Sequence, residues 1–198
     1  HLVSENGVVL LSPAYKQFHA HLGEITSYPP GYKENGSVFC HTNPWIMIAE
    51  ARLGRGSLAL DTYLRINPSK REEISEVHRC EPYVYAQTIS GKEAANPGEA
   101  KNSWLTGTAA WNYVAITQWI LGIRPTYEGL MIDPVLPDEW KGFSAKRLFR
   151  GVLYDIEVVR VGTNQKTQLL LDGVAVDGKV LPLAEAGTKQ VKVLVRVG

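Results

Sequence analysis

The sequence predicts an α+β chain, with a helical part up to about residue 125 and a β-structured part beyond it. Upstream, proline and glycine bracket apolar runs of helical length, which is how helices begin and end in a sequence. Downstream, apolar and polar residues alternate with the period of half-buried strands. The dipeptides Asp172-Gly173 and Asp177-Gly178 supply tight turns in that region. We therefore expect two architectures, in residues 1–125 and 126–198.

The overall composition is that of a globular protein. The chain has 198 residues, of which 44% are hydrophobic and 21% are charged, and this is enough to bury a sizeable core. Its 21 lysines and arginines against 20 acids give a net charge of +1, so no basic field exists to attract nucleic acid. The longest apolar stretches, Trp45–Ala49 and Val114–Leu121, are too short to cross a bilayer. Neither nucleic acid nor a membrane is an expected partner.

The start of the chain and its cysteines bear on the cellular compartment. His1 is not an initiator methionine and no leader-like segment follows it, so we expect a truncated or processed start. Cys40 and Cys80 are far apart, and they form neither a disulfide framework nor a zinc-binding spacing. Each is expected to be a small buried side chain in a reducing, cytoplasmic environment.

The first elements of the chain are a loop and a helix. The opening forty residues are rich in tyrosine, proline and glycine around Ser27–Gly31, which predicts an ordered loop. Pro44 then opens an apolar run, and the spacing predicts a helix over Trp45–Leu53 that stops at Gly54.

A second helix is expected close behind the first. Ser57 is a suitable N-cap, and the helical pattern runs to Ile66, where Asn67-Pro68 stops it. Residues Ser69–Ser75 predict a further short turn. The result would be helices joined by short links.

A loop and a long helix complete the first part. Gly91–Asn102 is rich in glycine, proline, asparagine and alanine, which predicts a loop. Ser103–Leu121 is a long apolar segment that predicts a mostly buried helix. This segment carries the tryptophans Trp104, Trp111 and Trp119.

The second part predicts strands. From Leu148 to Val158 apolar side chains alternate with polar ones, and Gln190–Val197 alternates more strictly. With the Asp-Gly turns between shorter apolar runs, these strands predict an antiparallel β module.

Two segments could bind an anion, although the spacing of their residues alone does not identify either as a binding site. His41 lies just before the expected helix start, where free amides and an imidazole can meet an anion. The alternative is an imidazole packed against Trp45. The hydroxyl of Thr106 and the amide of Gly107 precede an apolar stretch in the same way, and an ordinary helix cap is the alternative there.

The sequence by itself nominates no catalytic pair. Glycoside chemistry needs a general acid opposite a nucleophile or base, and no two carboxylates stand out among the solvated ones. Many aromatic residues flank the polar candidates. Such rings suit the apolar faces of sugars, but core packing explains them equally well.

Four segments in order closely resemble glycoside hydrolase family 94, the family of the cellobiose and chitobiose phosphorylases. Two shorter segments extend the resemblance to about residue 160. The four are Tyr28–Gly36, Phe39–Trp45, Glu81–Gln87 and Lys101–Trp111, and the two are Gly122–Pro125 and Asp138–Phe143.

The resemblance implies an inverting phosphorolysis of a β-linked disaccharide, which converts cellobiose and phosphate to α-glucose 1-phosphate and glucose. It implies inorganic phosphate as co-substrate, with no cofactor and no metal. Gln87 matches a position that binds the donor sugar. The phosphate-binding positions are matched by His41, Thr106 and Gly107. The positions on the acceptor side are matched by Glu24, Tyr28 and Lys33.

The resemblance also implies a fold and a missing acid. Residues 1–125 would be the closing helices of an (α/α)6 barrel, and residues 126–198 a C-terminal β-sandwich. The family's catalytic aspartate lies upstream of these segments, so this chain alone is expected to be inactive. The complete protein is expected to be a homodimer.

Three alternatives remain open at this point. Within the same class, the substrate could be N,N'-diacetylchitobiose in place of cellobiose. From other classes, the chain could be an inactive structural fragment or a carbohydrate-binding module.

Overall fold

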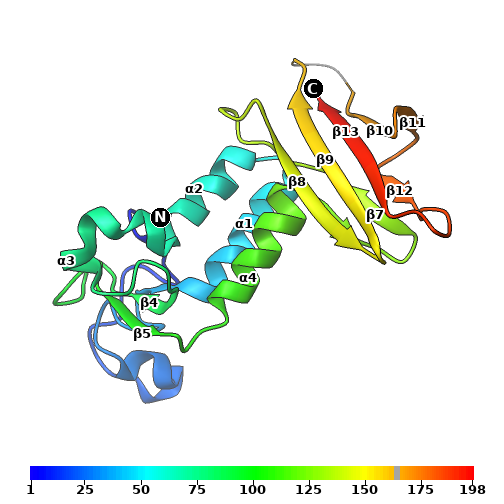
Figure 1. Ribbon diagram of the computed structural model, residues 1–198. Helices are drawn as coiled ribbons and strands as arrows, with labels where there is room; N and C mark the ends of the chain where they lie inside the picture. Colours follow the sequence, from blue (N-terminus) through cyan, green and yellow to red (C-terminus); the bar gives the residue numbers. More distant parts are fainter. Residues whose placement is uncertain (163–165) are drawn as a thin grey trace. The chain divides into compact units, whose positions relative to one another are not determined.

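The computed structural model describes residues 1–162 and 166–198 and combines helices with β-sheets (Figure 1). Contacts gather the chain into two units. One holds His1–Glu50 and Leu58–Ala115, and the other holds Ala51–Ser57 and Ile116–Gly198. The predicted α+β class is confirmed. Because the units are groups of residues in contact, the domain boundary predicted at residue 125 stays a prediction, as does the barrel.

The N-terminal forty residues are mostly loop, as predicted, with a few short elements. Strands β1 (Val3–Ser4) and β2 (Gly7–Val8) form a hairpin. Two short 3₁₀ turns follow, η1 (Ala20–Leu22) and η2 (Glu24–Ser27). The next element, β3, spans Val38–Phe39.

The two helices predicted after the loop are present. A 3₁₀ turn, η3 (Cys40–Thr42), leads into α1 (Asn43–Arg52), and α2 spans Gly56–Ile66. The predicted cap at Ser57 is wrong, because α2 begins one residue earlier. The Ser57 hydroxyl instead donates to Asp138 Oδ2 at 2.8 Å.

Short helical turns occupy the segment predicted as a further turn. They are η4 (Pro68–Lys70), η5 (Glu72–Ile74) and α3 (Ser75–His78). Asn67 starts this series by accepting a hydrogen bond from the Ser69 amide at 3.1 Å.

The long helix predicted over 103–121 is wrong in its first part. Ala100–Ser103 is strand β5, which pairs with β4 (Ala86–Ile89), so the predicted loop also ends early. The helix α4 spans only Thr108–Val114 and continues as a π-helix, η6 (Ala115–Ile120). The segment is not mostly buried either, since Trp104 is 69% exposed and Trp111 40% exposed.

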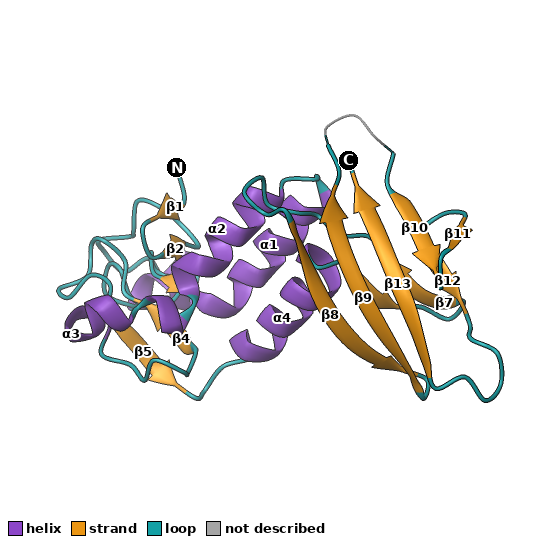
Figure 2. Ribbon diagram, turned by 45° about the horizontal axis from the view of Figure 1, so that its top comes forward, coloured by secondary structure: helices purple, strands orange, loops and turns teal. Residues whose placement is uncertain are grey.

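The described residues of the second unit form two sheets. Five strands lie in the order β11-β10-β13-β9-β8, and Figure 2 shows them side by side. Their bounds are β8 Gly142–Phe149, β9 Val152–Arg160, β10 Gln168–Leu171, β11 Val174–Val176 and β13 Gln190–Val197. A smaller sheet has the order β12-β7-β6, with β6 Ile123–Pro125, β7 Gly129–Ile132 and β12 Val180–Pro182.

The prediction of a wholly antiparallel β module is wrong at one pair. β13 runs parallel to β9, with Val193 opposite Ile156, while the other pairs of both sheets are antiparallel. Parallel partners need a long connection, and residues 161–189 supply it with β10, β11 and β12. Alternation in the sequence identifies the strands but does not encode their direction.

The alternating apolar side chains of β9 and β13 form the core of this unit. Tyr154, Ile156 and Val158 point to one face and are buried, as are Val193 and Val195 on the neighbouring strand. Their polar neighbours lie on the other face, which is the period-2 pattern expected of a half-buried sheet.

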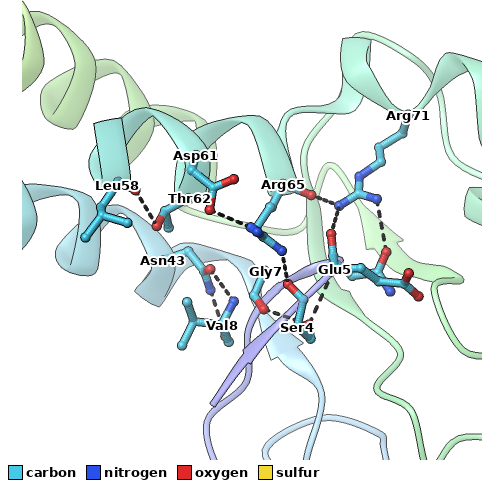
Figure 3. A network of polar contacts seen from close by, with 11 residues as sticks. Ser4, Glu5, Gly7, Val8, Asn43, Leu58, Asp61, Thr62, Arg65 and Arg71 are labelled. Carbon is cyan, nitrogen blue, oxygen red and sulfur yellow. Dashed lines mark hydrogen bonds and ion pairs between the residues drawn. The ribbon is translucent and has the colours of Figure 1, made fainter. Parts of the chain in front are cut away.

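A polar network fixes the N-terminal hairpin to the helices (Figure 3). The guanidinium of Arg65 donates to Ser4 O at 2.6 Å and that of Arg71 to Glu5 O at 3.2 Å. At the other end of the hairpin, Asn43 accepts a hydrogen bond from the Val8 amide at 2.8 Å and donates to Val8 O at 3.1 Å. Asn43 is the first residue of α1, so the network holds the start of that helix.

Burial of a thiol predicts a loss of stability at alkaline pH. Cys40 is 1% exposed, and burial raises its pKa from 9.0 to about 12. Between these pH values the unfolded chain loses a proton that the folded protein keeps, so stability falls as pH rises. Between pH 8 and about pH 10.5, the free energy of unfolding of the native protein should fall. We expect this fall to be about 2 kcal/mol larger than in a Cys40→Ala variant. Urea unfolding of both proteins at the two pH values measures this difference.

Cys80 provides the matched control. Its thiol is only half-buried, so the prediction of a buried side chain is confirmed for Cys40 and wrong for Cys80. A Cys80→Ala variant should still lose most of the stability that the native protein loses at alkaline pH. Equal pH dependence in the native protein and Cys40→Ala would contradict the prediction.

Candidate active site

The strand directions bring three sequence-predicted residues to one end of a small sheet. β3, β4 and β5 are neighbours, and β4 is antiparallel to both others. The end of β3 leads to His41, the start of β4 carries Gln87, and the end of β5 leads to Thr106. These points all lie at the same end of the sheet because antiparallel neighbours reverse direction. The elements after β3 and β5, η3 and α4, contact each other.

His41 lies in a row of aromatic side chains. Its ring meets Phe39 edge-on with 5.0 Å between centroids and Trp45 with 5.7 Å. Trp45 in turn meets Trp111 of α4 at 5.6 Å. The imidazole therefore packs against Trp45, as one alternative from the sequence has it. Within the described residues its nitrogens make no hydrogen bond, so they are available to an anion.

Thr106 and Gly107 stand directly before α4. Thr106 Oγ1 accepts a hydrogen bond from the Thr108 amide at 3.1 Å and lies 2.5 Å from Thr108 Oγ1. Only one hydroxyl hydrogen can lie between these two oxygens, so the pair has a second one to donate elsewhere. Thr108 Oγ1 can donate to Ala86 O over a long distance of 3.4 Å. The hydrogen of Thr106 is available to a ligand when Thr108 donates to Thr106 Oγ1 instead. A Cβ on Gly107 would lie 3.8 Å from Trp111, which links this turn to the aromatic row.

Lys33 and Gln87, which are 54 positions apart, are in direct contact. Lys33 Nζ donates to Gln87 Oε1 at 2.7 Å. Asn102 Nδ2 donates to the same oxygen at 2.9 Å. We call these three side chains the amide cluster. The sequence nominated Lys33 and Gln87 through the family resemblance but missed Asn102, because only the strand pairing places it beside Gln87.

Glu24 and Tyr28 form a separate pair. The Tyr28 hydroxyl donates to Glu24 Oε1 at 3.1 Å, and this hydrogen bond raises the pKa of Tyr28 above its ordinary value. The backbone of Tyr28 is fixed by buried Asn35, whose amide donates to Tyr28 O at 2.7 Å. No hydrogen bond joins this pair to the amide cluster within the part of the chain that the structure describes.

A further carboxylate lies close to Trp104. The indole Nε1 donates to Glu81 Oε1 at 3.1 Å, and Tyr83 meets the Trp104 ring edge-on at 6.5 Å. A hydrogen bond from its own backbone, and then that of Trp104, hold the pKa of Glu81 below its ordinary value. A carboxylate of lowered pKa is suited to accept hydrogen bonds and not to act as a general acid at neutral pH.

The described residues limit the other chemistry available. Over 1–162 and 166–198, no three side chains of the metal-binding types are grouped so that they could hold an ion. No helix in the same ranges is long and apolar enough to cross a bilayer. What the site offers is the ammonium group of Lys33 together with imidazole, hydroxyl and amide groups, which suits the binding of an anion and of sugar hydroxyls.

Comparisons with known proteins identify the family of the chain. Residues 1–122 match the family model described as the catalytic domain of the glycosyl hydrolase 94 superfamily. The chain is 38% identical to an N,N'-diacetylchitobiose phosphorylase of Vibrio proteolyticus over 98% of its own length and 24% of that protein. It is 40% identical to an N,N'-diacetylchitobiose phosphorylase of Vibrio furnissii over 89% of its length and 22% of that protein.

A third relative has a different named substrate. The chain is 35% identical to a solabiose phosphorylase of Paenibacillus borealis, over 92% of its length and 24% of that protein. It thus spans about a quarter of the length of each of these three relatives. The family match covers more than half of the chain, from His1 to Gly122, and ends where the helices give way to strands. The chain therefore belongs to the glycosyl hydrolase 94 superfamily.

Proposed function

We propose that the complete protein containing this chain is a disaccharide phosphorylase, and that this chain supplies its phosphate-binding and sugar-binding side chains. The observation that carries the proposal is the convergence of His41, Gln87 and Thr106 at one end of the β3-β4-β5 sheet. Family membership and three phosphorylase relatives support it.

In the proposed reaction, a phosphate oxygen attacks the anomeric carbon of a β-linked disaccharide. The bond from that carbon to the glycosidic oxygen breaks, and the departing oxygen takes a proton from a general acid outside this chain. Attack from the opposite face inverts the anomeric centre, so the products are an α-sugar 1-phosphate and a free sugar. The protein's task is to hold a doubly charged nucleophile in line with the bond it attacks.

The phosphate would be held by donors from two elements. The imidazole of His41 and the hydroxyl of Thr106 donate to its oxygens, and the Gly107 amide adds a third donor. These donors lower the free energy of the transition state because they are already in position when charge moves. The rings of Phe39 and Trp45 hold the imidazole in place.

The sugar would be held by side chains of the amide cluster and of the Glu24–Tyr28 pair. Gln87 binds the donor sugar, while Glu24, Tyr28 and Lys33 line the acceptor side. Two relatives named for N,N'-diacetylchitobiose favour that disaccharide. Cellobiose is the other candidate, and the two differ by the N-acetyl groups at carbon 2.

The test is an assay of the complete protein with inorganic phosphate and each disaccharide in turn. We expect α-sugar 1-phosphate to form with at least one of them, in proportion to the disaccharide consumed, and to be absent when phosphate is left out. Phosphorus NMR identifies both the ester and its anomeric configuration. Consumption without phosphate, or no cleavage of any β-disaccharide, would contradict the proposal. Sugar binding without cleavage would favour a carbohydrate-binding module.

A further inference from the structure

Asn102 lies beside Gln87 in the β4–β5 ladder. The ladder pairs their neighbours on both sides, Ala86 with Ser103 and Thr88 with Lys101. Side chains at facing positions of two strands share one face of a sheet. This explains why Asn102 reaches Gln87 Oε1 at 2.9 Å while Lys33 reaches the same atom at 2.7 Å.

The chemistry of Lys33 fixes which way the Gln87 amide faces. An ammonium group only donates hydrogen bonds, so the amide atom next to it has to be the oxygen. Asn102 fills the second acceptor position of that oxygen with its own amide hydrogen. Gln87 therefore turns its Nε2 away from both. Within 1–162 and 166–198 no hydrogen bond uses that nitrogen, so its two hydrogens are available to a ligand.

The backbone of Asn102 is held in the left-handed region, with φ of 55°. Residues other than glycine rarely adopt this backbone conformation, and asparagine is among those that tolerate it best. Trp104, two residues on, has φ of 69° and tolerates the region poorly. Strained residues of this kind persist where a binding site requires their geometry. The strained segment connects the amide cluster to Thr106.

We propose that Asn102 is a positioning residue which, together with Lys33, holds the Gln87 amide as a hydrogen-bond donor toward an acceptor oxygen of the bound sugar. This inference rests on the proposed function. Without the Asn102 side chain, only Lys33 holds Gln87 Oε1 in its orientation. The amide then rotates more freely and presents the correct hydrogens to the sugar for a smaller fraction of the time.

The left-handed backbone allows a clean test, because glycine adopts it without strain. In the complete protein, Asn102→Gly should raise KM for the disaccharide about 5-fold, the worth of one neutral hydrogen bond, and leave KM for phosphate unchanged. Asn102→Asp should have a larger effect, of about 20-fold, because its carboxylate repels Gln87 Oε1 and attracts Nε2. Steady-state kinetics with each substrate varied separately measure both effects.

A double-mutant cycle distinguishes positioning from a general structural effect. If Asn102 acts through Gln87, then Asn102→Gly should change little in a Gln87→Ala background. The control is Arg79→Gly, since Arg79 is exposed and has φ of 52°. It should leave both KM values unchanged.

Each outcome bears on one claim. An inactive native protein would contradict the proposed function. An active native protein with unchanged KM in Asn102→Gly, or with additive effects in the cycle, would overturn the role of Asn102 alone. If Asn102→Gly does not fold, as judged by thermal unfolding, Asn102→Asp decides the question.

Discussion

Replacing His41 with alanine is expected to lower kcat/KM for phosphate about 100-fold in the complete protein. Removing one hydrogen-bond donor to a transition-state anion has an effect of about this size in other enzymes. The imidazole is held at the end of β3 by Phe39 and Trp45, and its nitrogens form no hydrogen bond among the described residues. KM for the disaccharide should change little, because the proposed sugar-binding side chains lie in the amide cluster and the Glu24–Tyr28 pair. Initial rates with phosphate and disaccharide varied in turn measure the two effects.

His41 also packs between rings, so a packing defect has to be separated from a lost donor. His41→Asn keeps a hydrogen-bond donor at the position and should recover part of the loss, while His41→Phe keeps the ring contacts and should not. His21→Ala is the matched control, because His21 is an exposed imidazole on η1. A His41→Ala protein with native kcat/KM for phosphate would refute the phosphate-binding role.

Gly122→Ala is expected to destabilise the second unit by about 3–5 kcal/mol, the sum of left-handed strain and a backbone clash. Gly122 has φ of 70°, and a Cβ there would lie 2.0 Å from Asp133 O. The two residues approach closely because the Asp133 amide donates to Gly122 O at 2.9 Å. Urea unfolding followed by circular dichroism should show a lower midpoint with an unchanged slope.

Gly173→Ala separates the two causes. Gly173 has φ of 85°, but a Cβ there would meet nothing within 4 Å. This variant carries only the conformational strain, so we expect a loss of about 1 kcal/mol. If both variants lose the same stability, the close approach at Gly122 does not contribute.

The sequence predicts best those elements whose signals are local. α1 and α2 match the predicted helices within a residue or two because Pro44, Gly54 and Asn67-Pro68 act on the backbone next to them. β9 and β13 match because alternation reflects which side chains face the core. β8 spans Gly142–Phe149, so most of it lies before the alternating run that the sequence shows from Leu148. The π-helix η6 has no comparable local signal.

The failures come from contacts between distant segments. Trp104 and Leu105 extend an apolar run, so the pattern favours a helix from Ser103. In the structure Ser103 pairs with Ala86 in a ladder, and Trp104 takes a left-handed backbone that no helix contains. Pairing energy from β4 overrides the local preference, and no periodicity in one segment reveals it.

The candidate site shows the same division. From spacing alone His41 and Thr106 are weak candidates, and only the family resemblance nominates Lys33 and Gln87. The roles of these residues stay predictions, while the Lys33–Gln87 contact is a feature of the structure. Asn102 carried one usable signal, since asparagine is enriched at left-handed positions. Its partner could not be named before the register of β4 and β5 was known.

The position of β13 in the sheet affects how the chain folds while it is being synthesised. It is the middle strand of the five-stranded sheet, and in the described residues the β10–β11 hairpin joins that sheet only through it. The hairpin therefore emerges from the ribosome before residues 190–197, and it waits with one open edge until they follow. Such high contact order slows folding, because chain entropy is lost before distant partners meet. During that interval the open edge is a site where a chaperone, or another nascent chain, can pair.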